Sequence, residues 1–170
     1  PNLQNIGASW SELLSLDAVS FTDSSYSLTD FGSKMALLPL EPRFSKSILL
    51  AASTFNCSVE MVSLISILTE KHILFTPRKE NKKVIENNRK KFVSEYGDIL
   101  MLLNVYNSYI LVRKSCRDKT SDERQCISDN WCQEHAVNSR ALCNVQKIRK
   151  QLFAKMKALD LPVISAQSTY

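Results

Sequence analysis

The chain has 170 residues, 44% of them hydrophobic, which is enough to bury the core of one ordinary domain or of two small ones. Only three glycines and five prolines are present, which argues against an all-β sandwich or barrel, because hairpins and bulges consume glycine. A net charge of +5 and a pI near 9.0 suit a polyanionic partner without requiring one. No apolar run approaches the roughly 20 residues of a membrane span, and residues 1–10 lack the layout of a secretory signal. We therefore expect a mainly helical intracellular protein with no membrane partner.

Five cysteines, an odd number without paired spacing, do not predict a disulfide framework. Cys126, Cys132, His135 and Cys143 lie close together in the sequence, and Cys132 and His135 would share one face of a helix. No CxxC pair accompanies them, and their spacing matches no common zinc module. Reduced thiols and a structural histidine are therefore favoured over a zinc site.

The first 50 residues predict a helix, a hairpin and a second helix. Apolar residues recur at helical spacing over residues 3–16, and two β-prone pieces at 19–21 and 26–28 flank a polar turn. A further helix is expected to start at Thr29. This order predicts a winged helix over residues 1–50 that lacks its usual first helix, with the hairpin as the wing.

Residues 51–165 predict a helical bundle. Pro42 suits the first turn of a helix whose apolar stripe runs to Phe55, and Ser58 is expected to cap a helix that is apolar nearly all round. Residues 78–91 suggest a charged surface helix, and residues 99–110 suggest a core helix.

The last third of the chain predicts a loop, two helices and a strand. Dense charge over residues 113–130 suggests a mobile loop, followed by helices at 131–137 and 142–159. Pro162 should end the last helix, and Val163 and Ile164 look like a first strand, so that residues 166–170 would begin a further domain.

Four stretches carry a family resemblance. They are Leu-Thr-Asp-Phe-Gly-Ser-Lys-Met-Ala-Leu-Leu-Pro-Leu-Glu-Pro-Arg-Phe-Ser-Lys-Ser-Ile-Leu-Leu (28–50), Asn-Cys-Ser-Val-Glu-Met-Val-Ser-Leu-Ile-Ser-Ile-Leu (56–68), Gly-Asp-Ile-Leu-Met-Leu-Leu-Asn-Val-Tyr (97–106) and the run from Trp131 through Leu152. In this order and spacing they resemble the helicase-associated region of DEAH-box RNA helicases, a winged helix that runs into a bundle called the ratchet. Two positions depart from the family pattern: residues 15–18 hold no glycine before the wing, and Ile99 stands where a histidine is usual.

The resemblance implies a non-catalytic part of an ATP-driven enzyme that moves 3′ to 5′ along single-stranded RNA. It implies further domains, namely two RecA-like motor domains and an OB-fold, and ATP and Mg²⁺ bound by the motor. The chain itself contains neither a GxxxxGK[ST] loop nor an Asp-Glu-x-His run, so we expect no cofactor and no catalytic residue in this segment. The family acts in RNA processing, so a nuclear or nucleolar location is expected, with the cytoplasm as the alternative. Residues 90–95 and the long last helix look more like the ribosome-biogenesis members than the splicing members.

RNA contacts are expected on the C-terminal side of residues 28–50, near the start of the last long helix. Asn138 and Arg140 lie at a polar junction between two helices, and Lys147, Arg149 and Lys150 follow on the last helix. The alternative is that the first two cap and brace the helix, while the others are solvated on the face opposite the core.

A second surface concerns protein partners. In the family, glycine-patch activators dock on the winged part, and Leu13, Leu16, Val19 and Phe21 are the candidate docking residues, although all four also suit a core. Two other classes of function stay open: a free-standing winged-helix binder of duplex nucleic acid, and a protein-interaction scaffold.

Overall fold

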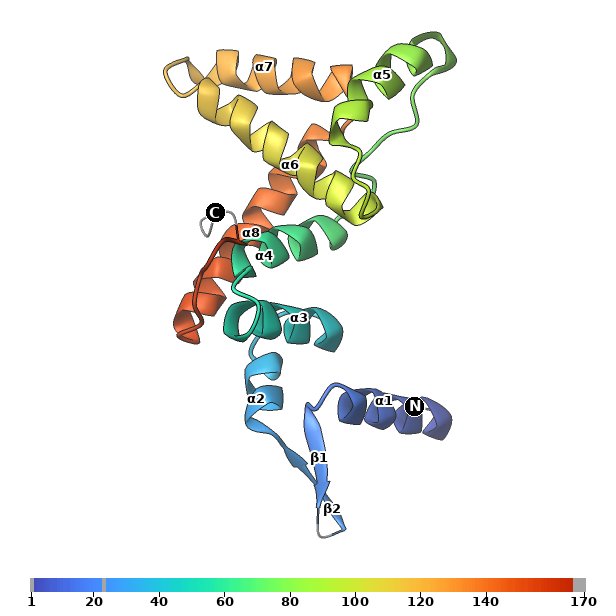
Figure 1. Cartoon of the computed structure of the whole chain (residues 1–170), viewed down its shortest axis with the longest axis vertical. Helices are drawn as coiled ribbons and strands as arrows, with labels where there is room; N and C mark the ends of the chain where they lie inside the picture. The colour runs from blue at the N-terminus through green and yellow to red at the C-terminus, as the bar shows by residue number, and fades with distance from the viewer. Residues whose placement is uncertain (1, 23, 167–170) are drawn as a thin grey trace. The chain divides into compact units, whose positions relative to one another are not determined.

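A computed structural model of the chain describes residues 2–22 and 24–166 (Figure 1). Its elements are α1 (Leu3–Ser15), β1 (Val19–Thr22), β2 (Ser25–Leu28), α2 (Asp30–Ala36), α3 (Pro42–Ser53), α4 (Ser58–Leu68), η1 (Lys79–Asn81), α5 (Lys82–Arg89), η2 (Lys90–Phe92), α6 (Asp98–Ser115), α7 (Ser121–Glu134) and α8 (Ser139–Ala158). The predicted fold class, mainly α with a small hairpin wing before a set of helices, is confirmed. Among the described residues, no helix has the length and apolar character that a membrane span requires.

The chain divides into two compact units, which differ from the predicted division at residue 50. The first unit combines residues 1–62 with 151–170, and the second comprises residues 63–150. Helix α3 and the first five residues of α4 thus belong with the winged part, and α3 packs against α2.

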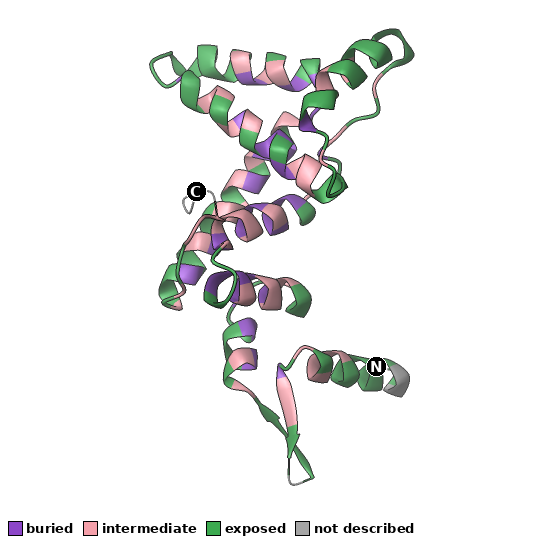
Figure 2. Ribbon diagram, in the orientation of Figure 1, coloured by how far each residue is buried: buried purple, intermediate pink, exposed green. Residues whose placement is uncertain are grey.

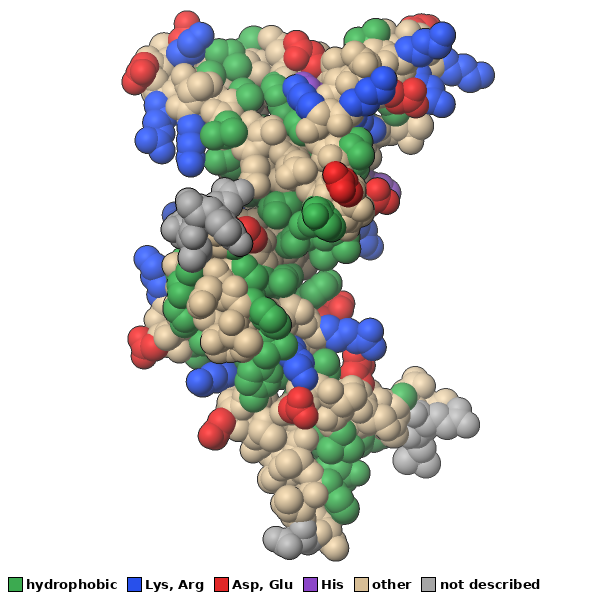
Figure 3. Space-filling model, viewed as in Figure 1, with side chains coloured by type: hydrophobic (Ala, Val, Ile, Leu, Met, Phe, Trp, Pro, Cys, Tyr) green, Lys and Arg blue, Asp and Glu red, His purple; other side chains and the backbone are tan. Residues whose placement is uncertain are grey.

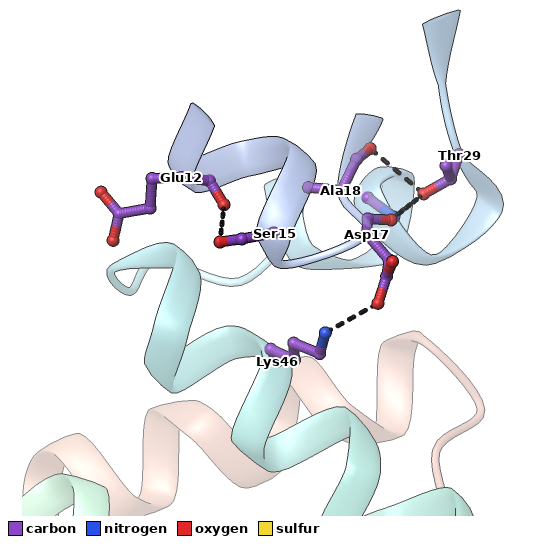
Figure 4. Close-up of polar contacts among 7 residues, drawn as sticks. Glu12, Ser15, Asp17, Ala18, Thr29 and Lys46 are labelled. Atoms are coloured by element: carbon purple, nitrogen blue, oxygen red, sulfur yellow. Dashed lines mark hydrogen bonds and ion pairs between the residues drawn. The ribbon is translucent and has the colours of Figure 1, made fainter. Parts of the chain in front are cut away.

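In the first unit, α1 leads into an antiparallel hairpin in which Val19 pairs with Leu28 and Thr22 with Ser25. The hairpin is exposed over most of its length (Figure 2). Thr29 caps α2, as predicted: its hydroxyl accepts a hydrogen bond from the Gly32 amide at 2.8 Å. The same hydroxyl donates to the carbonyls of Asp17 and Ala18, so that one side chain fixes the start of α2 against the start of β1 (Figure 4).

Two further contacts hold the winged part together. Asp17, which adopts a left-handed φ of 56°, accepts from Lys46 of α3 at 2.9 Å (Figure 4). Gly32 lies against the backbone of Ala18 so closely that a Cβ there would overlap the Ala18 carbonyl. Glycine is required at this position for close approach, although the helix itself would favour alanine.

Residues 161–166 return to the start of α4 without forming the predicted strand. The amide of Ile164 donates to the Ser58 hydroxyl, and its carbonyl accepts from Val59, so its polar groups are satisfied by a helix start instead of a sheet. Ser58 is accordingly the first residue of α4, and its hydroxyl bonds this returning segment where a cap was predicted. The predicted further domain at 166–170 falls, except for Ala166, outside the described residues.

In the second unit, α6, α7 and the first half of α8 enclose the core. The buried members of this core are Ile67, Ile73, Phe92, Leu103, Val105, Tyr106, Tyr109, Cys132, Val137, Ala141, Leu142 and Val145. Burial raises the pKa of Tyr109 to about 12, with Arg113 and Cys143 as hydrogen-bond neighbours of its hydroxyl. The surface helix predicted within residues 78–91 is present as α5, and Lys and Arg side chains gather over it (Figure 3).

Two sequence predictions in these regions are wrong. Residues 113–130 are not a loop: α6 continues to Ser115, and α7 starts at Ser121 behind a capping box between Thr120 and Glu123. The periodicity was hidden because a serine, Ser128, occupies a fully buried position of α7. Phe55 does not extend the buried stripe of α3 either; it is 66% exposed, because the helix ends at Ser53.

Candidate nucleic-acid interface

A short antiparallel pairing forms the frame of the candidate site in the second unit. Leu74 and Val137 form an isolated β-bridge, flanked by hydrogen bonds from Phe75 N to Ala136 O and from Asn138 N to Ile73 O, both 2.8 Å. Ala136 adopts a left-handed φ of 47°, an uncommon conformation for a residue with a Cβ. This turn brings the end of α7 alongside residues 73–75, which are separated from it by some sixty positions in the sequence.

Arg89, the last residue of α5, locks this frame. Its Nε donates to His135 O at 2.7 Å, and its Nη2 donates to Ala136 O at 2.7 Å and to Phe75 O at 2.9 Å. Burial lowers the pKa of Arg89 from its ordinary value, but a guanidinium remains charged at neutral pH. One cation therefore ties three carbonyls on two segments of the chain.

Asn138 occupies the N-cap of α8. Its Oδ1 accepts from the Ala141 amide at 3.3 Å, and its Nδ2 donates to His72 O at 3.4 Å. Both ends of the carboxamide are thus engaged in capping and bracing. This is the alternative that the sequence left open, and a contact of Asn138 with RNA stays a prediction.

The cations predicted on α8 divide into two groups around the helix. At about 100° per residue, Lys147 lies about 20° from Arg140 around the axis, whereas Arg149 lies about 180° away. Arg149 donates to Ser63 of α4 at 2.8 Å and is half-buried, so it braces two helices. Arg140, Lys147 and Lys150 are exposed, and within the described chain their side chains form no hydrogen bond or ion pair. We refer to Arg140, Asn144 and Lys147 as the α8 face.

Two adjoining cavities open beside the start of this face. One, of 530 Å³, is lined by Phe75, Asp129, Cys132, Gln133, Val137, Asn138, Ser139 and Arg140. The other, of 680 Å³, is lined by Phe75, Thr76, Pro77, Arg78, Asn81, Ile85, Cys132, Gln133, Ala136 and Val137. Phe75, Cys132, Gln133 and Val137 line both cavities, and we call the two cavities together the bridge cleft.

Sequence reasoning missed most of the bridge cleft. Phe75 follows Ile73 and Leu74 in an apolar triplet that resembles core, and Arg89 is one of many cations in a charged stretch. The one local indication of the bridge cleft was Pro77, because a proline after an apolar run predicts a change in chain direction.

The four candidate docking residues lie in the first unit and are also divided. Leu13 and Val19 line a cavity of 300 Å³ together with Met35 and Leu38, whereas Leu16 lies outside that lining. Phe21 is exposed on the hairpin and packs against Tyr26, which in turn stacks on Trp10 at a centroid distance of 4.5 Å. The structure thus presents an apolar cavity and an exposed aromatic cluster in place of one continuous docking line.

The chain matches one family model and is similar to several RNA helicases. Residues 41–102 match the model of the helicase associated domain (HA2), ratchet-like. The ATP-dependent RNA helicase DHX33 of Mus musculus is 33% identical over 167 residues, covering 98% of this chain and 22% of the relative. The pre-mRNA-splicing factor ATP-dependent RNA helicase prp22 of Schizosaccharomyces pombe is 35% identical over 153 residues, covering 90% of this chain and 12% of the relative.

This chain belongs to the helicase-associated region of DEAH-box RNA helicases. The chain spans 22% of the length of DHX33 and 12% of the length of prp22. The ratchet-like match covers α3, α4, α5 and the start of α6, so it includes Phe75, Arg78 and Arg89 of the bridge cleft. The α8 face lies beyond it but inside the stretch that aligns with DHX33.

The thiols and the histidine considered as zinc ligands have other environments in this helicase-associated region. No group of three or more potential ligands is close enough for a metal among the residues that the structure describes. His135 is buried, stacks on Trp131 and donates from Nδ1 to the Trp131 carbonyl at 2.7 Å. Burial, with the nearby charges of Asp129 and Cys143, raises the pKa of Cys132 to about 12, which disfavours the thiolate that a metal needs.

Proposed function

We propose that this chain forms one wall of the single-stranded RNA path of an ATP-dependent RNA helicase, and that the α8 face contacts the phosphates. The observation that carries the proposal is the pair of exposed cations, Arg140 and Lys147, on one side of α8 and without a protein partner in the described chain. Cations along the phosphates are the general means by which single strands are held. Asp129 also lines the cavity beside Arg140, and both of its oxygens accept from the neutral amide of Gln125, so a bound phosphate would lie on the side of Arg140 and Lys147.

In the whole enzyme, ATP and Mg²⁺ would act in the motor domains, and this region would couple its grip on RNA to 3′ to 5′ movement and to remodelling of RNA or RNA–protein complexes. The name of one relative, a pre-mRNA-splicing factor, supports a role in RNA processing. A nuclear or nucleolar location is part of the proposal. The rigid frame around Arg89 supports such coupling, because a fixed wall transmits displacement.

The test is binding of a fluorescently labelled single-stranded RNA to the 170-residue chain over a range of salt concentrations. Binding should weaken steeply with salt, because each phosphate contact contributes a slope of about −0.7 in log K against log salt. Arg140→Ala and Lys147→Ala should each reduce the slope by about that amount. Lys157→Ala is the matched control: it is an exposed cation of the same helix, about 25 Å along the axis from Arg140 and about 15 Å from Lys147.

Each other outcome favours another class of function. Preference for duplex DNA over single-stranded RNA would favour a free-standing winged-helix binder. The absence of binding to either nucleic acid would favour a protein-interaction scaffold. Slopes unchanged in both α8 variants would reject the α8 face as the contact.

We propose docking of a glycine-patch-type activator as a second function, located on the winged part. Glu12 and Asp17 pair with Arg43 and Lys46 of α3. No Lys or Arg precedes Lys34, so α1 and the hairpin themselves offer no cation to a polyanion, and this surface suits a protein better. The exposed Phe21 and the cavity lined by Leu13 and Val19 offer apolar anchors. A glycine-patch peptide should bind the chain at least tenfold less tightly after Phe21→Ser, while RNA binding is unaffected; equal binding would reject Phe21 as an anchor.

A further inference from the structure

Phe75 is an exposed aromatic residue on a fixed backbone. Its amide donates to Ala136 O at 2.8 Å and its carbonyl accepts from Arg89 at 2.9 Å, so both main-chain polar groups are satisfied by the protein. Its side chain is nevertheless 50% exposed, whereas Ile73 in the same segment is 6% exposed. A single exposed apolar residue is ordinary, but one held at both backbone groups has the position of its Cβ fixed before any ligand arrives.

The surroundings of Phe75 are those of a polar, cationic cleft. Phe75 lines both parts of the bridge cleft, with Arg78 in one part and Arg140 in the other. Both guanidinium groups lack a hydrogen-bond or ion-pair partner among the residues placed by the structure. The volumes of 680 and 530 Å³ fall in the range of small-ligand sites, about 300–1,000 Å³. An aromatic residue that shares one cavity lining with Arg78 and the other with Arg140 suits a base with a phosphate on each side.

We propose that Phe75 is a stacking platform for one unstacked base of the single-stranded RNA, with Arg78 and Arg140 on the flanking phosphates. This inference rests on the proposed function and extends it from phosphate contact to recognition of a base. Stacking suits a strand that must move, because every base has a π face and none is read by sequence. Phe75 would therefore act at each nucleotide step without selecting the sequence.

The experiment compares two probes of equal length on the 170-residue chain: a single-stranded oligouridylate and the corresponding abasic ribose-phosphate oligomer. The unaltered chain should prefer the base-bearing probe by about tenfold, the effect of one base–aromatic stack. Phe75→Leu should remove this preference, and Phe75→Trp should keep or increase it. Arg140→Ala should weaken the binding of both probes by a similar factor.

The outcomes separate the two proposals. If both probes bind with the same salt dependence and no base preference, or if Phe75→Leu keeps the preference, the stacking proposal is overturned while phosphate contact stands. If neither probe binds in a salt-dependent way, the proposed function fails first. Comparing the probes on the unaltered chain requires no variant, so a poorly folded Phe75→Leu would not prevent a decision.

Discussion

Removal of the Arg89 side chain is the sharpest test of how the bridge cleft is held. In Arg89→Ala the carbonyls of Phe75, His135 and Ala136 each lose a donor. Hydrogen bonds that involve a charged group contribute about 1.5–3 kcal/mol each, but water can replace a donor wherever it reaches the carbonyl. His135 is buried, whereas Ala136 is half-buried and Phe75 is exposed, so we count one bond in full and the other two in part. The expected loss is about 3 kcal/mol in the free energy of unfolding.

A loss of this size should be plain in the second unit. For a unit of 60–100 residues, 1 kcal/mol corresponds to about 4–8 °C in Tm, so Arg89→Ala should lower Tm by more than about 10 °C. The assays are urea unfolding, for the free energy, and thermal unfolding, for Tm, both followed by tryptophan fluorescence in a Trp10→Phe background. Trp131, which packs against His135 and Phe92, then reports on the second unit alone.

Arg78→Ala provides the control for charge. Arg78 is exposed, and its side chain makes no bond with the described residues, so its loss should change stability by less than about 0.5 kcal/mol. A cost for Arg89→Ala below about 1 kcal/mol, or equal to that of Arg78→Ala, would refute the view that Arg89 locks the frame.

Three further predictions address local features. Gly32→Ala should destabilise the winged part by more than about 2 kcal/mol, because the added Cβ would overlap the Ala18 carbonyl. Gly7→Ala, whose Cβ would meet no atom, should stabilise α1 by up to about 1 kcal/mol. Equal melting temperatures for the two variants would contradict this. Burial lowers the pKa of His135 below its ordinary 6.5, so the unfolded chain binds the proton more tightly than the folded chain. The free energy of unfolding should therefore decline as pH falls below about 6.5, which urea midpoints at several pH values would measure. An identical decline in His135→Gln would assign the pH dependence to another group. Asn138→Ala should cost about 1 kcal/mol through loss of the α8 cap, and Asn138→Ser should recover most of it in the same denaturation assay, so equal costs for the two variants would exclude capping as the cause.

The predicted RNA contacts show what a linear sequence conveys about a site. The last helix carries three cations of similar chemistry, Arg140, Lys147 and Arg149. Their spacing alone places Arg149 on the opposite side of the helix from the other two. The side of α8 that packs against the protein is identified only by the hydrogen bond from Arg149 to Ser63, which lies 86 positions away in the sequence. Asn138 was recognised as a junction residue, but the partner of its amide at His72 lies 66 positions away.

The sequence by itself determined the elements whose causes are local. The Thr29 cap, the Pro42 helix start, the apolar periods of α3 and α8 and the almost wholly apolar sequence of α4 depend on residues that are near one another in the chain, so they could be predicted. The tertiary structure decided the bridge cleft, because Arg89 finds its carbonyl acceptors up to 47 positions away and Phe75 is exposed only through that pairing. It also decided that residues 121–134 form a helix, because packing makes Ser128 a core residue although its chemistry is that of a surface. Local hydrogen bonding and periodicity are encoded in neighbouring residues, whereas burial and long-range pairing depend on which distant segments the fold brings together.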